Sequence, residues 1–339
     1  MTIRRVVLGL LSILLITLLG LLFIPRTYDA PTFQERAGTQ YWDLPSGSHI
    51  GYTHIKSSSG QKRPPIIYLH GGPGGIVKDE VIHTLRPLAD QGHDVYLYDQ
   101  VGSGHSGRLS DISEYTIDRH LLDLKAIIEL IGAERVILLG HSWGAVLATQ
   151  YAADFPDQIA RMVLDGPGPI FPVNRSLAST TPPDTLNLRA PAFTNRDGNQ
   201  KAYNWRAKTI RKVAVLGGIK VASDREADRF FTYLNRELNK STVCAGDQAP
   251  LPTGGGGFYA HLMTMKSLQS IPDKRAALKE LDMPVLLIRG QCDNQNWGFI
   301  QEYLQLLPDI RLEMVEHSGH SIVHARPNRY LELVSAFME

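Results

Sequence analysis

The sequence predicts an α/β fold in which a mostly parallel sheet is flanked by helices and carries an inserted helical cap. Short apolar runs that suit buried strands alternate with longer segments of helical periodicity, which is typical of a parallel sheet with crossover helices. A long polar segment interrupts this alternation before the last strands. The 339 residues are 43% hydrophobic and 20% charged, a balance that is typical of globular chains.

The predicted strands of the parallel sheet are compact apolar runs, as expected of strands that are buried on both faces. They cover residues 65–69, 95–98, 135–139, 162–164, 285–288 and 311–315. Residues 49–55 (HIGYTHI) alternate between apolar and polar side chains, so we expect an earlier antiparallel strand there.

The predicted helices lie between these strands. They cover residues 81–91, 116–131, 143–154, 296–307 and 327–338. Right-handed crossovers place such helices on both faces of the sheet.

The alternation stops after Gly166. Residues 166–195 are rich in Pro, Asn and Thr, residues 199–240 are helical and polar, and a run of glycines occupies 254–257. We interpret residues 166–281 as a cap or lid over the carboxyl ends of the strands, where open α/β sheets bind ligands. The core domain then comprises residues 26–165 and 282–339.

The N-terminal segment, residues 1–25, is predicted to be a transmembrane anchor. Residues 6–24 carry no charge, and as a helix they span roughly 28 Å, about the thickness of the bilayer interior. Arg4 and Arg5 precede the run, which places them in the cytoplasm and the following domain outside it. A cleaved signal that yields a secreted protein is the alternative.

Charge and cysteine content exclude several classes of protein. The net charge of +1 excludes a strong general attraction to nucleic acid, and two cysteines exclude a disulfide scaffold or a Cys-rich zinc module. Outside the cytoplasm Cys244 and Cys292 can pair, whereas the other interpretation is two buried free thiols. We slightly favour the free thiols.

The segment Gly140-His141-Ser142-Trp143-Gly144 follows a predicted strand and opens a predicted helix. This is the context of the G-x-S-x-G nucleophile elbow, in which a serine stands on a sharp, strained turn. Glycines on both sides allow the close chain approach that the turn requires. We therefore predict that Ser142 is a nucleophile.

The segment His70-Gly71-Gly72-Pro73-Gly74-Gly75 follows another strand and can present backbone N–H groups to an oxyanion. We assign the oxyanion hole to the N–H groups of Gly72 and Trp143. Phosphate binding is the rival interpretation, but the Lys-Ser/Thr pair of a P-loop does not follow. His70 is interpreted as a residue that fixes the turn.

The acid and the base are expected after the nucleophile, in the chain order Ser, Asp/Glu, His. Asp293 follows the strand at 285–288, and His320 follows the strand at 311–315. Both fall at carboxyl ends of strands, on the same side as the nucleophile. Asp165 is the reserve acid, and His317 and His324 are the rival bases.

These motifs resemble those of serine α/β-hydrolases, and specifically the prolyl aminopeptidase (proline iminopeptidase) branch. HGGPGG at 70–75, DQVGSGHSG at 99–107 and GHSWGAVLA at 140–148 carry the resemblance. It implies an α/β-hydrolase fold and removal of an N-terminal residue, often Pro, from short peptides, with carboxylates of the cap holding the free α-ammonium.

The sequence departs from that branch in three places: Val101 replaces an Arg, Gln291-Cys292 precedes the acid, and Arg206 follows Trp205 where many members have Trp-Glu. The missing glutamate would bind the substrate amine. Glu226 and Glu237 are the substitutes that we consider for substrate binding.

The predicted activity is that of a serine hydrolase that forms an acyl-enzyme and needs no metal or organic cofactor. The substrate is a short peptide with a free N-terminus or, as the alternative, an ester or another amide. A binding module without catalysis is the third possibility, but such modules usually lack part of the triad.

Overall fold

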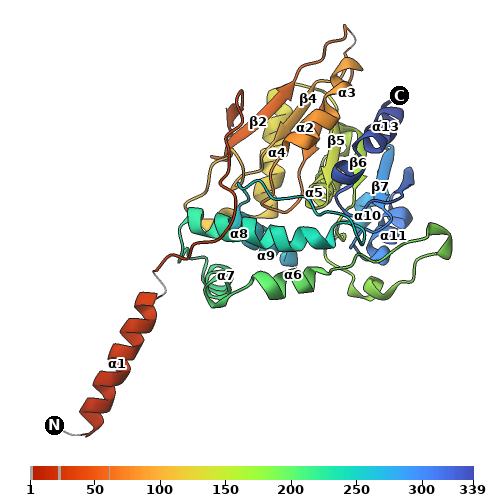
Figure 1. The fold of residues 1–339 in the computed structure, drawn as a ribbon. Coiled ribbons are helices and arrows are strands. Elements are labelled where there is room, and N and C mark those ends of the chain that lie inside the picture. The colour runs from red at the N-terminus through yellow and green to blue at the C-terminus, as the bar shows by residue number, and fades with distance from the viewer. Residues whose placement is uncertain (1–2, 22–23, 61) are drawn as a thin grey trace.

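The computed structural model describes residues 3–21, 24–60 and 62–339, which form an eight-stranded sheet with helices on both faces (Figure 1). The strands follow one another across the sheet in the order β1-β2-β4-β3-β5-β6-β7-β8. They are β1 (Gln40–Asp43), β2 (His49–Ile55), β3 (Ile66–Leu69), β4 (Val95–Tyr98), β5 (Val136–His141), β6 (Ile159–Asp165), β7 (Val285–Gly290) and β8 (Ile310–Val315).

Six neighbouring strands, from β4 to β8, are parallel, and β2 joins them antiparallel through β4. The predicted α/β fold with a mostly parallel sheet is therefore confirmed. The edge strand β1 was not predicted, because its four residues (QYWD) contain no apolar run.

Both faces of the central strands β3, β5 and β7 are buried, as their apolar sequences required. On β5, Leu138 faces one hydrophobic cluster while Ile137 and Leu139 face the other. The first cluster includes residues of α4 (Ile117–Ile131), α5 (Trp143–Asp154) and α11 (Trp297–Leu306). The second includes residues of α2 (Asp79–Leu85), α3 (Pro87–Asp90), α12 (Ile322–Ala325) and α13 (Pro327–Met338).

The predicted helix at residues 81–91 is two helices, because Pro87 begins a new one. Proline has no backbone N–H to continue the hydrogen bonds of α2, and it is well tolerated in the first turn of α3. The other predicted helices of the core agree with the structure to within one residue at each end.

Residues 166–284 connect β6 to β7 and are called the insertion below. They form α6 (Asn195–Ala202), α7 (Trp205–Gly217), α8 (Asp224–Leu238), α9 (Phe258–Ser267) and α10 (Arg275–Leu278). The helices α6 to α9 lie together beside one end of the sheet (Figure 1). Aromatic side chains of α8 and α9, such as Phe230 and Phe258, join the first hydrophobic cluster. The exact domain boundaries stay a prediction.

At the N-terminus the structure forms α1 (Ile3–Leu21), which extends away from the rest of the molecule (Figure 1). Residues 22–23 of the apolar run lie outside the described residues. Within the described part of the chain, no helix combines the length and the apolarity needed to cross a bilayer.

Cys244 and Cys292 form a disulfide, so the slight preference for free thiols was wrong. Sequence spacing could not reveal the pairing, because it depends on how the insertion folds back onto the core. Their Cα atoms lie 5.2 Å apart, within the range that a disulfide needs.

Candidate active site

Ser142 stands on the sharp turn between β5 and α5. Its backbone has φ 55° and ψ −113°, a conformation that residues other than glycine rarely adopt. The backbone N–H of Ser142 donates to the carbonyl of Asp165 at 2.8 Å, which ties the turn to the end of the neighbouring strand β6. This strained turn lifts the serine side chain above the carboxyl edge of the sheet.

The two glycines of the motif are required by close backbone contacts. A Cβ on Gly144 would lie 1.9 Å from the carbonyl oxygen of Leu69, and one on Gly140 would lie 2.5 Å from backbone atoms of Gly144. Because backbone atoms cannot move aside, neither position accepts a side chain.

The loop after β3 contacts Ser142 through Gly71. A Cβ on Gly71 would lie 3.1 Å from the Cβ of Ser142, and the next residue, Gly72, has φ 133°. Trp143 is the first residue of α5, where a backbone N–H has no acceptor within the helix. The structure thus brings Gly71, which precedes Gly72, into contact with Ser142, and it places Trp143 at the start of α5.

A buried network holds these two loops together. The indole of Trp143 donates to Oε1 of Gln100 at 2.7 Å, and Nε2 of Gln100 donates to the carbonyl of His70 at 3.0 Å. Nε2 of His70 accepts from the backbone N–H of Gln100 at 2.9 Å, while Nδ1 contacts the carbonyl of Gly71 at 2.8 Å. Burial lowers the pKa of His70, so it is a neutral residue that fixes the turn, as expected.

Asp99, the partner of Gln100 in the motif, organises the same region. Its Oδ1 accepts from the backbone N–H of Val77 at 2.6 Å, and its Oδ2 accepts from that of His105 at 2.9 Å. Asp99 therefore connects the loop after β3 with its own loop after β4.

His320 and Asp293 lie together in the loops after β8 and β7. Nδ1 of His320 is 3.0 Å from Oδ1 of Asp293, which also accepts from the backbone N–H of Gln295 at 2.9 Å. Burial raises the pKa of Asp293, but the attraction and hydrogen bond of His320 outweigh it and lower that pKa to about 2. Burial lowers the pKa of His320, and the carboxylate of Asp293 more than reverses this effect, so the net pKa is raised.

Two further residues support this pair, and the sequence reasoning missed both. Gly166 follows β6, and a Cβ there would lie 3.0 Å from Nδ1 of His320 and 3.1 Å from Oδ2 of Asp293. Arg289 is buried beneath the pair, and its Nη2 donates to the backbone carbonyls of Asp293 and Gln295. The only sequence signal for Arg289 was a charge at the end of an apolar strand.

The rival residues have other partners. Nδ1 of His141 lies 3.0 Å from Oδ2 of the reserve acid, Asp165, and Nδ1 of His324 lies 3.2 Å from Oε2 of Glu80. The backbone N–H of His317 donates to the side chain of Gln291 at 3.3 Å. The structure therefore places neither rival histidine beside Asp293.

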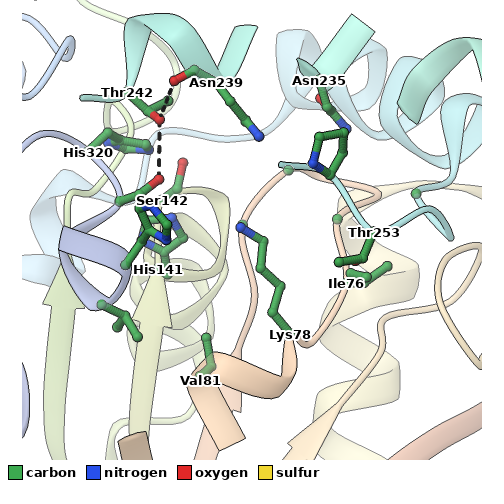
Figure 2. A pocket seen from close by; sticks show the side chains of 18 of the residues that line it. Ile76, Lys78, Val81, His141, Ser142, Asn235, Asn239, Thr242, Thr253 and His320 are labelled. Atoms are coloured by element: carbon green, nitrogen blue, oxygen red, sulfur yellow. Dashed lines mark hydrogen bonds between the residues drawn. The ribbon is translucent and has the colours of Figure 1, made fainter. Parts of the chain in front are cut away.

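Ser142 and His320 open onto the same cavity of about 260 Å³ (Figure 2). The wall that the insertion supplies is neutral and includes Phe231, Thr232, Asn235, Leu238, Asn239 and Thr242. The core supplies Lys78 and Glu80, and Figure 2 shows Lys78 extending from the start of α2 into the space between Ser142 and Asn235.

Glu226 and Glu237, the carboxylates predicted to bind the substrate amine, are not among the residues that line this cavity. Glu226 forms an ion pair with Arg206 and also accepts from the backbone N–H of Arg26 at 2.9 Å. Glu237 lies 3.1 Å from Nζ of Lys201 and 2.6 Å from Nζ of Lys240. Their orientation depends on the rotation of α8, which the sequence alone did not specify.

The cavity-lining carboxylates of the described residues are Asp165 and Glu80. Asp165 contacts His141, and Glu80 contacts both His324 and, at 3.5 Å, Lys78. Each carboxylate thus already has a basic neighbour within the protein.

Comparison with known proteins gives one family and several relatives. The sequence profile of a family described as alpha/beta hydrolase fold matches residues 64–327. A proline iminopeptidase of Lactobacillus delbrueckii subsp. bulgaricus is 34% identical over 302 residues, covering 87% of this chain and 96% of the relative.

Solved structures agree with the fold. A proline iminopeptidase structure from Mycobacterium smegmatis has a TM-score of 0.58 at 20% identity and covers 89% of this chain and 97% of its own. An esterase structure from Exiguobacterium antarcticum has a TM-score of 0.57 at 16% identity and covers 88% of this chain and 98% of its own.

Proposed function

Because the chain belongs to the α/β-hydrolase fold family, we propose that this hydrolase is a serine hydrolase that acts through an acyl-enzyme. One observation carries the proposal: a strained nucleophile turn and a buried His320–Asp293 pair open onto one cavity. The placement of three side chains from distant parts of the chain in one site is the arrangement that acyl transfer requires.

In the proposed mechanism, Oγ of Ser142 attacks the substrate carbonyl carbon while Nε2 of His320 accepts the hydroxyl proton. His320 then gives this proton to the leaving group as the bond to the carbonyl carbon breaks. Asp293 orients the imidazole through Nδ1 and stabilises its cation. Water attacks the acyl-enzyme in the second half, with His320 again as base, and releases the acid and free Ser142.

The negative oxygen of each tetrahedral intermediate is stabilised by backbone N–H groups of Gly72 and Trp143 in this proposal. Removing one such donor typically costs about 2.7–4 kcal/mol of transition-state stabilisation. The positive end of the α5 dipole also favours negative charge at this position.

The cavity favours esters or amides whose acyl part carries no free ammonium. A buried ammonium needs a carboxylate that is free to pair with it. Glu226 and Glu237 point elsewhere, and the cavity-lining Asp165 and Glu80 have basic neighbours. The neutral wall of α8 therefore suits an uncharged acyl group better.

An aminopeptidase of the prolyl type is the second candidate. Its support is the family motif resemblance and the 34% identity to a proline iminopeptidase over most of both chains. In this case Glu80 would bind the substrate amine after giving up its contact with either His324 or Lys78.

The test compares kcat/KM of the purified full chain for three substrates: p-nitrophenyl acetate, proline p-nitroanilide and N-acetylproline p-nitroanilide. We expect ester hydrolysis, and loss of at least about 10³-fold in kcat with Ser142→Ala. Activity on proline p-nitroanilide that N-acetylation abolishes would identify the aminopeptidase instead.

A second measurement does not depend on the choice of substrate. A fluorophosphonate should form a covalent adduct on Ser142, detected by mass spectrometry of the tryptic peptide. The proposal that the protein is a serine hydrolase would be contradicted if the wild-type protein were not labelled. It would also be contradicted if the Ser142→Ala variant kept its turnover.

We also propose that the catalytic domain works outside the cytoplasm. The Cys244–Cys292 disulfide supports this location, because disulfides persist in oxidising compartments. Protease added to intact spheroplasts that express the full chain should digest the domain, and protection until lysis would contradict the proposal. N-terminal sequencing would distinguish a retained apolar run from a cleaved signal.

A further inference from the structure

The two loops that carry Asp293 and His320 both rest on one short segment of the insertion, residues 241–244. This segment follows α8 and is called the clamp below. Ser241 is fully buried and Val243 is buried, although the surrounding insertion is largely polar. Among the described residues, the clamp forms no hydrogen bond with the proposed nucleophile turn or the oxyanion loop, so its contacts concern the acid and the base.

Contacts with the acid loop flank Asp293 on both sides. On one side, Cys244 is joined to Cys292 by the disulfide. On the other side, Nδ2 of Asn294 donates to Oγ of Ser241 at 3.0 Å, and this hydroxyl donates to the carbonyl of Leu238 at 2.7 Å. Both chain neighbours of Asp293 are therefore attached to the insertion, Cys292 by a covalent bond and Asn294 by a hydrogen bond.

Contacts with the base loop likewise flank His320. A Cβ on Gly319 would lie 2.2 Å from the carbonyl oxygen of Thr242, so the two backbones touch there. After His320, the N–H of Ser321 donates to that same carbonyl at 3.4 Å, and its hydroxyl bonds to Oγ1 of Thr242 at 3.3 Å. Figure 2 shows Thr242 beside His320.

The two loops also bind each other. The backbone N–H of Cys292 donates to the carbonyl of Ser318 at 2.8 Å. The acid loop, the base loop and the clamp therefore form a closed set of contacts, and moving any one of them disturbs the other two.

We propose that the clamp is a positioning element for the reaction: it holds the Asp293 and His320 loops in register with Ser142, and the Cys244–Cys292 disulfide is its covalent part. The inference rests on the proposed function, because it assigns the acid and base roles to this pair. Reduction of the disulfide then lowers the catalytic rate without removing any reacting group. A displacement of about 1 Å at a reacting group can cost about 10²-fold in rate.

The experiment compares the oxidised full chain with the double variant Cys244→Ser/Cys292→Ser and with Ser241→Ala. Ser179→Ala is the matched control, since its exposed hydroxyl also donates to the carbonyl three residues earlier but, among the described residues, bonds to neither loop. For each protein, kcat, KM, the pH profile of kcat/KM, the melting temperature and the rate of fluorophosphonate labelling at Ser142 are measured.

We expect kcat of both clamp variants to fall by about 10- to 100-fold with KM within about twofold, while Ser179→Ala is unchanged. The acidic limb of the pH profile should move to lower pH, because His320 is less well aligned with Asp293. Dithiothreitol should reproduce the loss in the wild type and have no effect on the double variant.

The inference would be overturned if the clamp variants melted at a lower temperature but kept the wild-type kcat and pH profile when assayed well below that temperature. The clamp would then only stabilise the fold. Labelling of wild-type Ser142 in the same series reports on the proposed function separately. If the Ser142→Ala variant turns over substrate as fast as the wild type, the proposed function is wrong, and the positioning role is wrong with it.

Discussion

Nδ1 of His320 lies 3.0 Å from Oδ1 of Asp293, and both side chains are buried. The two groups change each other's protonation in opposite directions: the pKa of Asp293 is lowered to about 2, and that of His320 is raised. The carboxylate is therefore ionised throughout the range in which the imidazole titrates. In the proposed mechanism, the proton that controls activity therefore belongs to His320.

The pH dependence of kcat/KM should follow that proton. A general base must be neutral, so activity falls as the pH decreases through the raised pKa of His320. We expect the acidic limb to have its midpoint above the ordinary histidine value of about 6.5. Initial rates with p-nitrophenyl acetate between pH 5 and 9 measure it, and a midpoint below 6.5 would refute the assignment.

Asp293→Asn should lower kcat by about 10⁴-fold, as expected when the residue that orients the histidine can no longer stabilise its cation. The acidic limb should also move to lower pH, because without the Asp293 carboxylate the burial that lowers the pKa of His320 is opposed mainly by the charge of Asp165. Asp165→Asn, at the reserve acid, is the control and should cost far less. An equal loss in both variants would mean that Asp293 has no special role.

The fold class was predictable because local apolar runs indicate the strands of a parallel sheet, and right-handed crossovers then place helices on both of its faces. The grouping of the candidate site residues was predictable for a related reason. Ser142, Asp293 and His320 each follow a strand of one parallel sheet, and the carboxyl ends of such strands meet at one edge. The structure brings Asp293 and His320 together and opens Ser142 onto the same cavity.

Features that depend on tertiary packing were not predictable. The rotation of α8 directs Glu226 to Arg206 and leaves neutral side chains toward the cavity, a choice that periodicity does not encode. The pairing of Cys244 with Cys292 depends on how the insertion returns to the core. Arg289 looked like an ordinary charge at a strand end, and only the structure shows that it is buried and donates to the backbone carbonyls of Asp293 and Gln295.

Glu226→Gln tests the structural role of the buried ion pair with Arg206. Removing one partner of such a pair typically costs about 3–5 kcal/mol, because the other charge stays buried. Urea unfolding should show a loss of that order, whereas the activity ratio between p-nitrophenyl acetate and proline p-nitroanilide should stay constant. The control Glu237→Gln should lose less, since Lys201 is largely exposed.

A selective loss of activity on the proline substrate in Glu226→Gln would restore the amine-binding role that the geometry disfavours. If both variants lost the same free energy of unfolding, the buried pair of Glu226 with Arg206 would contribute no more to stability than the pair of Glu237 with the largely exposed Lys201.

The segment after α1 should stabilise the insertion through Tyr28. This side chain is 7% exposed and packs against Phe230 of α8, with ring centroids 5.2 Å apart. Nη2 of Arg229 donates to the Tyr28 carbonyl at 3.0 Å. Tyr28→Ala should cost about 3–5 kcal/mol, as for other buried aromatic truncations, with faster amide exchange concentrated in α8. Tyr41→Ala, at a 48% exposed position, is the control, and unchanged exchange in α8 would show that this segment does not hold the insertion.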